Sequence, residues 1–198
     1  MEPYFQTHHA VEAVYLLAML IWASLEVRQF LRQRKWRQTA DKVDSRAFAL
    51  AFCTVVILAV AALSLSPHIA PAAEIGDGAI VSGVGMVLLI TGIVLRAWSF
   101  HVLGQYFTFV VKVSSDQRVV STGPYRLLRH PSYTGALLAE IGTGLLYGNW
   151  AGLAVLILLT LAMILWRIRV EEKALFTGLD NEYSAYAAGR KRIVPLLW

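Results

Sequence analysis

Long apolar runs alternate with short charged stretches along most of this chain. Five segments are rich in apolar side chains, namely residues 11–27, 47–66, 79–95, 133–147 and 150–166. Residues 47–66 contain no charged side chain, and residues 132–166 contain only Glu140. A helix that crosses a bilayer core about 30 Å thick needs about 20 such residues. The pattern therefore predicts an integral membrane protein.

The spanning elements are expected to be helices. An open sheet edge cannot lie in lipid, and the sequence lacks the strict alternation of a barrel strand. Gly148 and Asn149 form a turn signal between the last two apolar segments, which predicts a tight helical hairpin. We therefore predict an all-α membrane bundle of about five transmembrane helices followed by a cytoplasmic C-terminal helix. Residues 1–78 would hold two spans and a basic loop, and residues 79–198 would hold the functional core.

The distribution of positive charge predicts the orientation of the bundle. Seven of the eighteen Lys and Arg residues lie in residues 28–46, whereas residues 66–78 and the hairpin tip contain none. By the positive-inside rule, the N-terminus lies outside and the C-terminus is cytoplasmic. The net charge of +5 does not predict a nucleic-acid binder, because the basic run adjoins a span and suits contact with anionic lipid headgroups.

The single cysteine, Cys53, lies within an apolar run. It cannot form an intrachain disulfide, and a thiolate metal site is not expected from one cysteine. We predict that Cys53 is a small buried residue.

Polar chemistry is expected in two long stretches on the cytoplasmic side, residues 104–131 and 170–198. In the first, Pro131 suits the first turn of the fourth span, and the N–H groups of that helix start favour an anionic or oxygen-rich group. Tyr125, His130 and Tyr133 lie around the same entrance. An interfacial aromatic belt is the alternative interpretation of these residues.

A second group of candidates consists of charged residues near the ends of the spans. Arg167 and Glu171 are i,i+4 neighbours on one face of a helix, and a solvated ion pair is the alternative to a functional role. Arg96 lies inside the inner end of the third span, where an ionisable side chain is a functional candidate or reaches toward the interface. The role of Glu140 in the fourth span stays open.

The order of motifs in the C-terminal half resembles the isoprenylcysteine carboxyl methyltransferase family. The resemblance covers about residues 92–198. It rests on Leu103-Gly104, Phe107, Val119-Val120, Gly123-Pro124-Tyr125, Arg129-His130-Pro131-Ser132-Tyr133, Gly135, Arg167, Glu171-Glu172, Leu175, Tyr183, Tyr186 and Pro195.

This resemblance implies a bound S-adenosylmethionine between the two cytoplasmic stretches. Its implied contacts are Lys112, Gln117, Arg118, Val119, Val120, Tyr125, His130, Pro131, Ser132, Tyr133 and Glu171. Arg167 would face the substrate, and Arg96 matches a further family arginine near it. Gln117 departs from the histidine of many relatives, and Lys112 replaces an amide-bearing residue of eukaryotic relatives. The implied location is a prokaryotic inner membrane.

The implied reaction is methylation of the carboxylate of a lipophilic acceptor that enters from the bilayer, such as a C-terminal prenylcysteine. A carboxylate is already ionised at neutral pH, so no general base and no metal are needed. Arginine supplies a bidentate fork that orients it. Methylation of a phospholipid or a small lipophilic molecule, a reductase and a non-catalytic membrane protein remain alternatives. The natural acceptor, the oligomeric state and the roles of Arg169 and Glu172 stay open.

Overall fold

The fold was analysed in a computed structural model of the chain, which describes residues 3–32, 42–76, 78–107 and 117–194. The long helices are α2 (His9–Arg32), α3 (Lys42–Ile69), α4 (Gly78–Leu103), α5 (Pro131–Leu146) and α6 (Trp150–Ala188). The short ones are α1 (Tyr4–Thr7), η3 (Pro71–Ala73), η4 (Gly104–Tyr106) and η5 (Gly123–Arg126). The described residues form no strand, only two isolated bridges. The predicted all-α class is confirmed.

Each predicted apolar segment lies within one of the long helices, except that Tyr147 is the C-cap residue after α5. Within the described residues, four helical stretches are long and apolar enough to cross a membrane: His9–Arg32, Leu50–Ile69, Gly78–Tyr106 and Trp150–Ala188. The fifth predicted span corresponds to α5, which has only 16 residues because it begins at Pro131 and ends at the hairpin. At 1.5 Å per residue, α5 is about 24 Å long.

Much of the apolar surface faces outward, as a bilayer requires. Leu20 of α2, Leu50 and Ile57 of α3 and Ile80 of α4 are among the exposed large apolar side chains. Cys53 of α3 is exposed as well, so the prediction that it is buried was wrong. An apolar run predicts that a residue faces an apolar environment, and in a membrane bundle that environment can be lipid.

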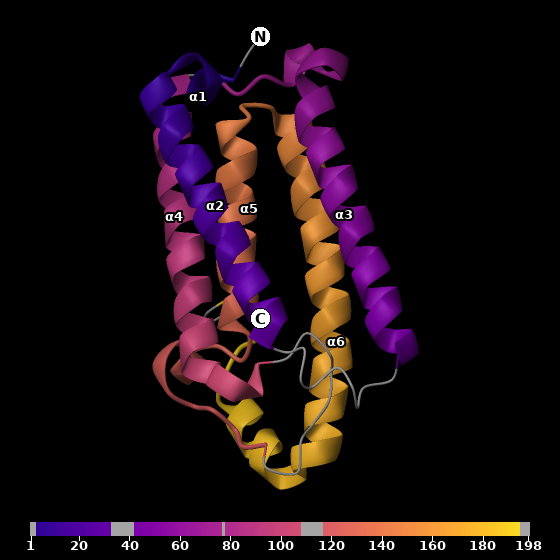
Figure 1. Ribbon diagram of the computed structural model, residues 1–198. Helices are drawn as coiled ribbons and strands as arrows, with labels where there is room; N and C mark the ends of the chain where they lie inside the picture. The colour runs from indigo at the N-terminus through magenta and orange to yellow at the C-terminus, as the bar shows by residue number, and fades with distance from the viewer. Residues whose placement is uncertain (1–2, 33–41, 77, 108–116, 195–198) are drawn as a thin grey trace.

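The helices pack as two neighbouring groups (Figure 1). Helices α2, α4 and α5 form one group, and α3 packs along α6 in the other. The closest contact joins α4 and α5, where a Cβ on Gly92 would lie 2.5 Å from the backbone nitrogen of Ala139. Glycines at this contact let the two backbones approach closely.

The predicted hairpin between α5 and α6 is confirmed. Gly148 adopts a φ of 66°, which suits glycine, and Asn149 follows as the N-cap of α6. The Asn149 side chain accepts hydrogen bonds from the N–H groups of Ala151 and Gly152, at 3.0 and 3.2 Å. The hairpin, η3 and the N-terminal helix α1 lie together at one end of the bundle (Figure 1). The η5 segment and the C-terminal end of α6 lie at the other end.

Candidate functional site

A pocket opens at the end of the bundle that holds η5. It has an empty volume of about 830 Å³, including the part that is open to solvent. Its walls come from the end of α4 and η4, from residues 117–120, from η5 and the start of α5, and from α6. The pocket therefore joins the two stretches of the sequence in which polar chemistry was expected.

Most of the predicted methyl-donor residues line this pocket. They are Gln117, Arg118, Val119, Val120, Tyr125, His130, Ser132, Tyr133 and Glu171. Pro131 does not line it, and is buried as the first residue of α5. Arg96 and Arg167 lie outside the lining, and Lys112 lies outside the described residues.

The start of α5 places three of the lining side chains. His130 is the N-cap residue, and Pro131 occupies the first helical position as predicted. The His130 carbonyl accepts a hydrogen bond from the Tyr133 N–H at 3.0 Å. The first turn therefore presents His130, Ser132 and Tyr133 to the pocket.

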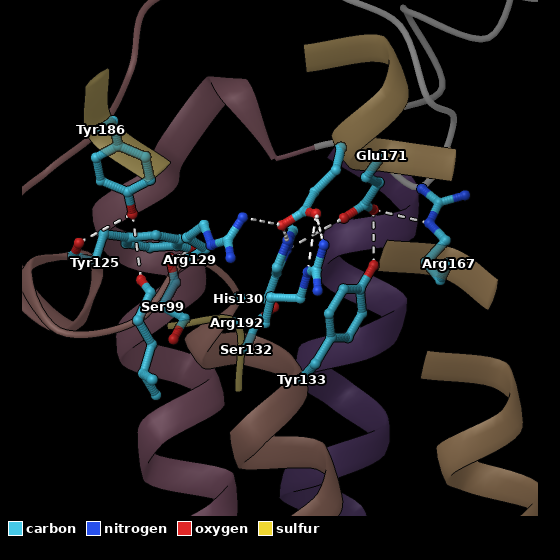
Figure 2. A network of polar contacts seen from close by, with 12 residues as sticks. Ser99, Tyr125, Arg129, His130, Ser132, Tyr133, Arg167, Glu171, Tyr186 and Arg192 are labelled. Carbon is cyan, nitrogen blue, oxygen red and sulfur yellow. Dashed lines mark hydrogen bonds and ion pairs between the residues drawn. The ribbon is translucent and has the colours of Figure 1, made fainter. Parts of the chain in front are cut away.

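Glu171 is the acceptor in a cluster at the edge of the pocket (Figure 2). The Tyr133 hydroxyl donates to Glu171 Oε1 at 2.7 Å, and Arg167 Nε donates to the same oxygen at 2.8 Å. His130 Nδ1 lies 3.7 Å from Glu171 Oε2. The predicted i,i+4 contact of Arg167 and Glu171 is present, and Arg167 is buried rather than solvated.

Glu172 is the shared partner in a second cluster of polar side chains. Its own side chain is only 6% exposed. Its Oε1 accepts from Arg129 Nη1 at 2.8 Å and lies 3.3 Å from His130 Nε2. Its Oε2 accepts from Arg192 at 2.9 Å. A buried carboxylate is stable only with such partners. Glu172 therefore joins α6, the start of α5 and the C-terminal segment.

The C-terminal segment folds back onto the pocket. Asp180 has φ 38° and ψ −113°, which interrupts the helical path of α6 and redirects the chain. Beyond this kink, the Tyr186 hydroxyl lies within hydrogen-bond distance of the Tyr125 and Leu128 carbonyls, at 2.9 and 3.2 Å (Figure 2). The Arg129 N–H donates to the Lys191 carbonyl at 2.8 Å. These bonds fasten the segment to the loop before α5.

Two buried polar atoms on residues that line the pocket have no hydrogen-bond partner among the described residues: Tyr183 Oη and Arg129 Nε. A buried polar group is normally paired, so these two atoms suit a polar ligand. The neighbouring Tyr125 side chain is also buried, and burial raises the pKa of its hydroxyl above its usual value of 10. That hydroxyl therefore stays protonated at neutral pH.

Arg96 lies behind the pocket rather than in its wall. Its Nε donates to Glu26 Oε1 of α2, and its Nη1 donates to the Ser132 carbonyl at 3.0 Å. The guanidinium lies over the rings of Trp22 and Phe100, at 5.4 and 4.7 Å from their centroids. Among the described residues, no group of three His, Cys, Asp or Glu side chains could hold a metal ion.

Several lining residues were missing from the predicted site. They are Leu103, Tyr106, Phe107, Arg129, Ala174, Leu175, Leu179, Tyr183 and Tyr186. Leu103, Phe107, Arg129, Leu175, Tyr183 and Tyr186 belong to the motifs of the family resemblance, which could have identified them. Ala174 and Leu175 follow Glu171 at i+3 and i+4, so helical spacing places them on the same face.

Comparisons with known proteins show which sequences and which fold this chain is similar to. Residues 84–177 match the Isoprenylcysteine carboxyl methyltransferase (ICMT) family. The chain is 39% identical to the protein-S-isoprenylcysteine O-methyltransferase of Saccharomyces cerevisiae over 105 residues. This match covers 52% of this chain and 44% of that protein. It is 33% identical over 114 residues to a probable protein-S-isoprenylcysteine O-methyltransferase of Oryza sativa subsp. indica. That match covers 54% of this chain and 57% of the rice protein. The chain thus spans about half the length of the curated relatives it matches.

A solved structure has the same fold. It is the eukaryotic intramembrane Ras methyltransferase ICMT, which matches with a TM-score of 0.65 at 24% sequence identity. The match covers 93% of this chain and 67% of that one. The helices outside residues 84–177 therefore belong to the shared membrane fold as well.

Proposed function

Because residues 84–177 match the isoprenylcysteine carboxyl methyltransferase family, we propose that this integral membrane protein is a carboxyl O-methyltransferase. It transfers a methyl group from S-adenosylmethionine to the carboxylate of a lipophilic acceptor such as a C-terminal prenylcysteine. The observation that carries the proposal is the pocket. Its walls bring together residues 117–120, the start of α5 and Glu171, which the family resemblance assigns to the methyl donor.

The residues of the pocket fit this cofactor. Small-molecule sites typically combine apolar walls with a few placed polar groups, and the lining of this pocket contains both. The Tyr183 hydroxyl and Arg129 Nε supply polar atoms that have no hydrogen-bond partner within the residues the structure describes. Glu171, His130 and Tyr133 would hold the polar end of S-adenosylmethionine, and residues 117–120 would cover it.

When bound, S-adenosylmethionine supplies a methyl group on a sulfonium, which a carboxylate can take by in-line displacement. The protein must then orient an acceptor that is already ionised. Arg167 is the candidate for this role because its buried guanidinium is fixed by Glu171 at the edge of the pocket. Positioning of this kind lowers the barrier without a general base. Arg96 is the second candidate, one layer behind Ser132.

The acceptor is expected to reach the site from the bilayer, with membrane lipids around the bundle. We place the pocket on the cytoplasmic side and the N-terminus outside, because Lys and Arg are concentrated in the connections at the end that carries the pocket. The expected location is a prokaryotic inner membrane.

Binding and turnover of the purified protein test this proposal. Calorimetric titration with S-adenosylmethionine should give saturable binding, and titration with NADPH should give none. His130→Ala and Tyr133→Ala should each weaken S-adenosylmethionine binding, because both side chains line the pocket. Trp150→Ala, an exposed aromatic at the opposite end, is the control. Binding of NADPH alone, or methyl transfer that never occurs to a farnesylated cysteine analogue, would refute the proposal.

A further inference from the structure

Arg96 pairs with Glu26 in the body of the bundle, and the proposed reaction assigns no role to Glu26. Glu26 lies in the last two turns of α2, outside the residues that match the family. Arg96 Nε donates to its Oε1, and the two side chains are 10% and 21% exposed. Trp22 of α2 and Phe100 of α4 flank the guanidinium. Helix α2 thus holds Arg96 through one carboxylate and one aromatic ring.

We infer that Glu26 is a specificity-determining residue that competes with the acceptor carboxylate for Arg96. The inference rests on the proposed function, in which Arg96 helps to orient the acceptor. Glu26 presents to Arg96 the same chemical group as the acceptor, a carboxylate. Two carboxylates beside one buried arginine would leave one negative charge uncompensated, which is strongly unfavourable in a low-dielectric environment. An acceptor carboxylate can therefore bind Arg96 only when Glu26 moves away.

The geometry allows this exchange. Of the two partners Glu26 is the more exposed, whereas Arg96 is fixed from the other side by the Ser132 carbonyl at 3.0 Å. Ser132 itself lines the pocket, so Arg96 is one residue away from the space for reactants. Glu26 is the partner that can leave Arg96. It lies within two turns of Arg32, a basic residue at the end of α2. We therefore expect Glu26 to exclude acids that bind Arg96 too weakly to displace it.

The effect of Glu26 on acceptor binding should depend on the charge of the acceptor. N-acetyl-S-farnesylcysteine carries the carboxylate, and its carboxamide is a neutral molecule of the same shape. Glu26→Gln removes the competing charge but keeps an oxygen that can accept from Arg96. We expect this variant to bind the acid about tenfold more tightly and the carboxamide unchanged. Binding of S-adenosylmethionine should not change.

Two further variants make the experiment specific. Glu26→Asp keeps the charge but withdraws it by one methylene, so it should give a smaller gain for the acid and fold even where Glu26→Gln is too unstable. Glu12→Gln removes another α2 carboxylate, which pairs with the exposed His9, and should change neither affinity. Thermal unfolding of each variant verifies that the fold is intact.

Three results would overturn the inference. Weaker acid binding in Glu26→Gln would show that Glu26 positions Arg96 instead of competing with the acceptor. Equal gains for acid and carboxamide would show a general loosening of the bundle, and unchanged affinity for both would make the pair structural. Failure of the proposed function is distinguishable, because the unmodified protein would then neither bind nor methylate the farnesylated acid.

Discussion

Glu171 and Glu172 are neighbours in the chain, yet their carboxylates belong to different clusters. Glu171 accepts hydrogen bonds from Tyr133 and Arg167 at the edge of the pocket. Glu172 is buried and pairs with Arg129 and Arg192. Consecutive residues on a helix are about 100° apart, so the two side chains point to different partners. The first cluster lies at the edge of the pocket, and the second holds the C-terminal segment in place.

This division predicts different effects of two matched substitutions. Glu172→Gln should destabilise the protein by roughly 3 kcal/mol, because it removes the charge that compensates two arginines at a buried position. Glu171→Gln should change stability by about 1 kcal/mol, since the Glu171 side chain is 21% exposed and an amide oxygen can still accept from Tyr133 and Arg167, but it should weaken S-adenosylmethionine binding. Thermal unfolding in detergent and calorimetric titration separate the two outcomes. Equal loss of stability in both variants would contradict the division.

Arg167 provides a test of catalysis. Arg167→Ala should lower turnover at least about a hundredfold, while affinity for S-adenosylmethionine falls by less than about tenfold, because the guanidinium orients the acceptor. Arg167→Lys should not restore turnover, since an ammonium cannot reproduce the fork of a guanidinium. Methyl transfer to a farnesylated cysteine analogue is the measurement. Full turnover in Arg167→Ala would reduce the Arg167–Glu171 contact to a structural ion pair.

Tyr183 and Tyr186 form a matched pair on the C-terminal part of α6. The Tyr186 hydroxyl bonds the backbone of the loop before α5, so Tyr186→Phe should cost about 1 kcal/mol of stability. The Tyr183 hydroxyl has no hydrogen-bond partner in the described part of the chain, so Tyr183→Phe should leave stability unchanged. It should weaken S-adenosylmethionine binding about fivefold to tenfold if the cofactor pairs with that hydroxyl.

The reverse pattern would be informative. A large loss of stability in Tyr183→Phe, with cofactor affinity unchanged, would show that the hydroxyl has a structural role and would remove Tyr183 from the proposed cofactor site.

The contact between α4 and α5 predicts that alanine substitutions at two glycines of α4 have different effects on stability. A Cβ at Gly92 would lie 2.5 Å from the backbone of Gly135 and Ala139, so Gly92→Ala should cost about 2 kcal/mol. At Gly83 no atom lies within 4 Å of the added Cβ, so Gly83→Ala should leave stability equal or slightly higher. Thermal unfolding compares them. An unaffected Gly92→Ala variant would contradict the close packing of these helices.

The orientation in the membrane can be tested with reporters. A reporter fused after Trp198 should read cytoplasmic, and one inserted near Ala73 should read external, because the connection around Ala73 contains no Lys or Arg. The opposite reading at either position would refute the orientation, and with it the cytoplasmic placement of the pocket.

Some features of this protein follow from the sequence alone. The membrane spans are readable because lipid imposes length and polarity on each helix separately. The Arg167–Glu171 contact and the helix start at Pro131 are readable because they depend on residues within one turn of each other. The resemblance of motifs identified half of the residues that line the pocket, since a family motif preserves contacts that no local pattern reveals.

Only the tertiary structure decided the other contacts. Glu26 and Arg96 are seventy residues apart, and their pairing depends on how α2 packs against α4. Arg192 reaches Glu172 because the chain changes direction at Asp180, and Gly178, two residues earlier, does not by itself indicate the new direction. The apolar run around Cys53 did not show whether this residue faces protein or lipid. In each case the partner is set by the relative placement of helices, and hydrophobic periodicity contains no information about that placement.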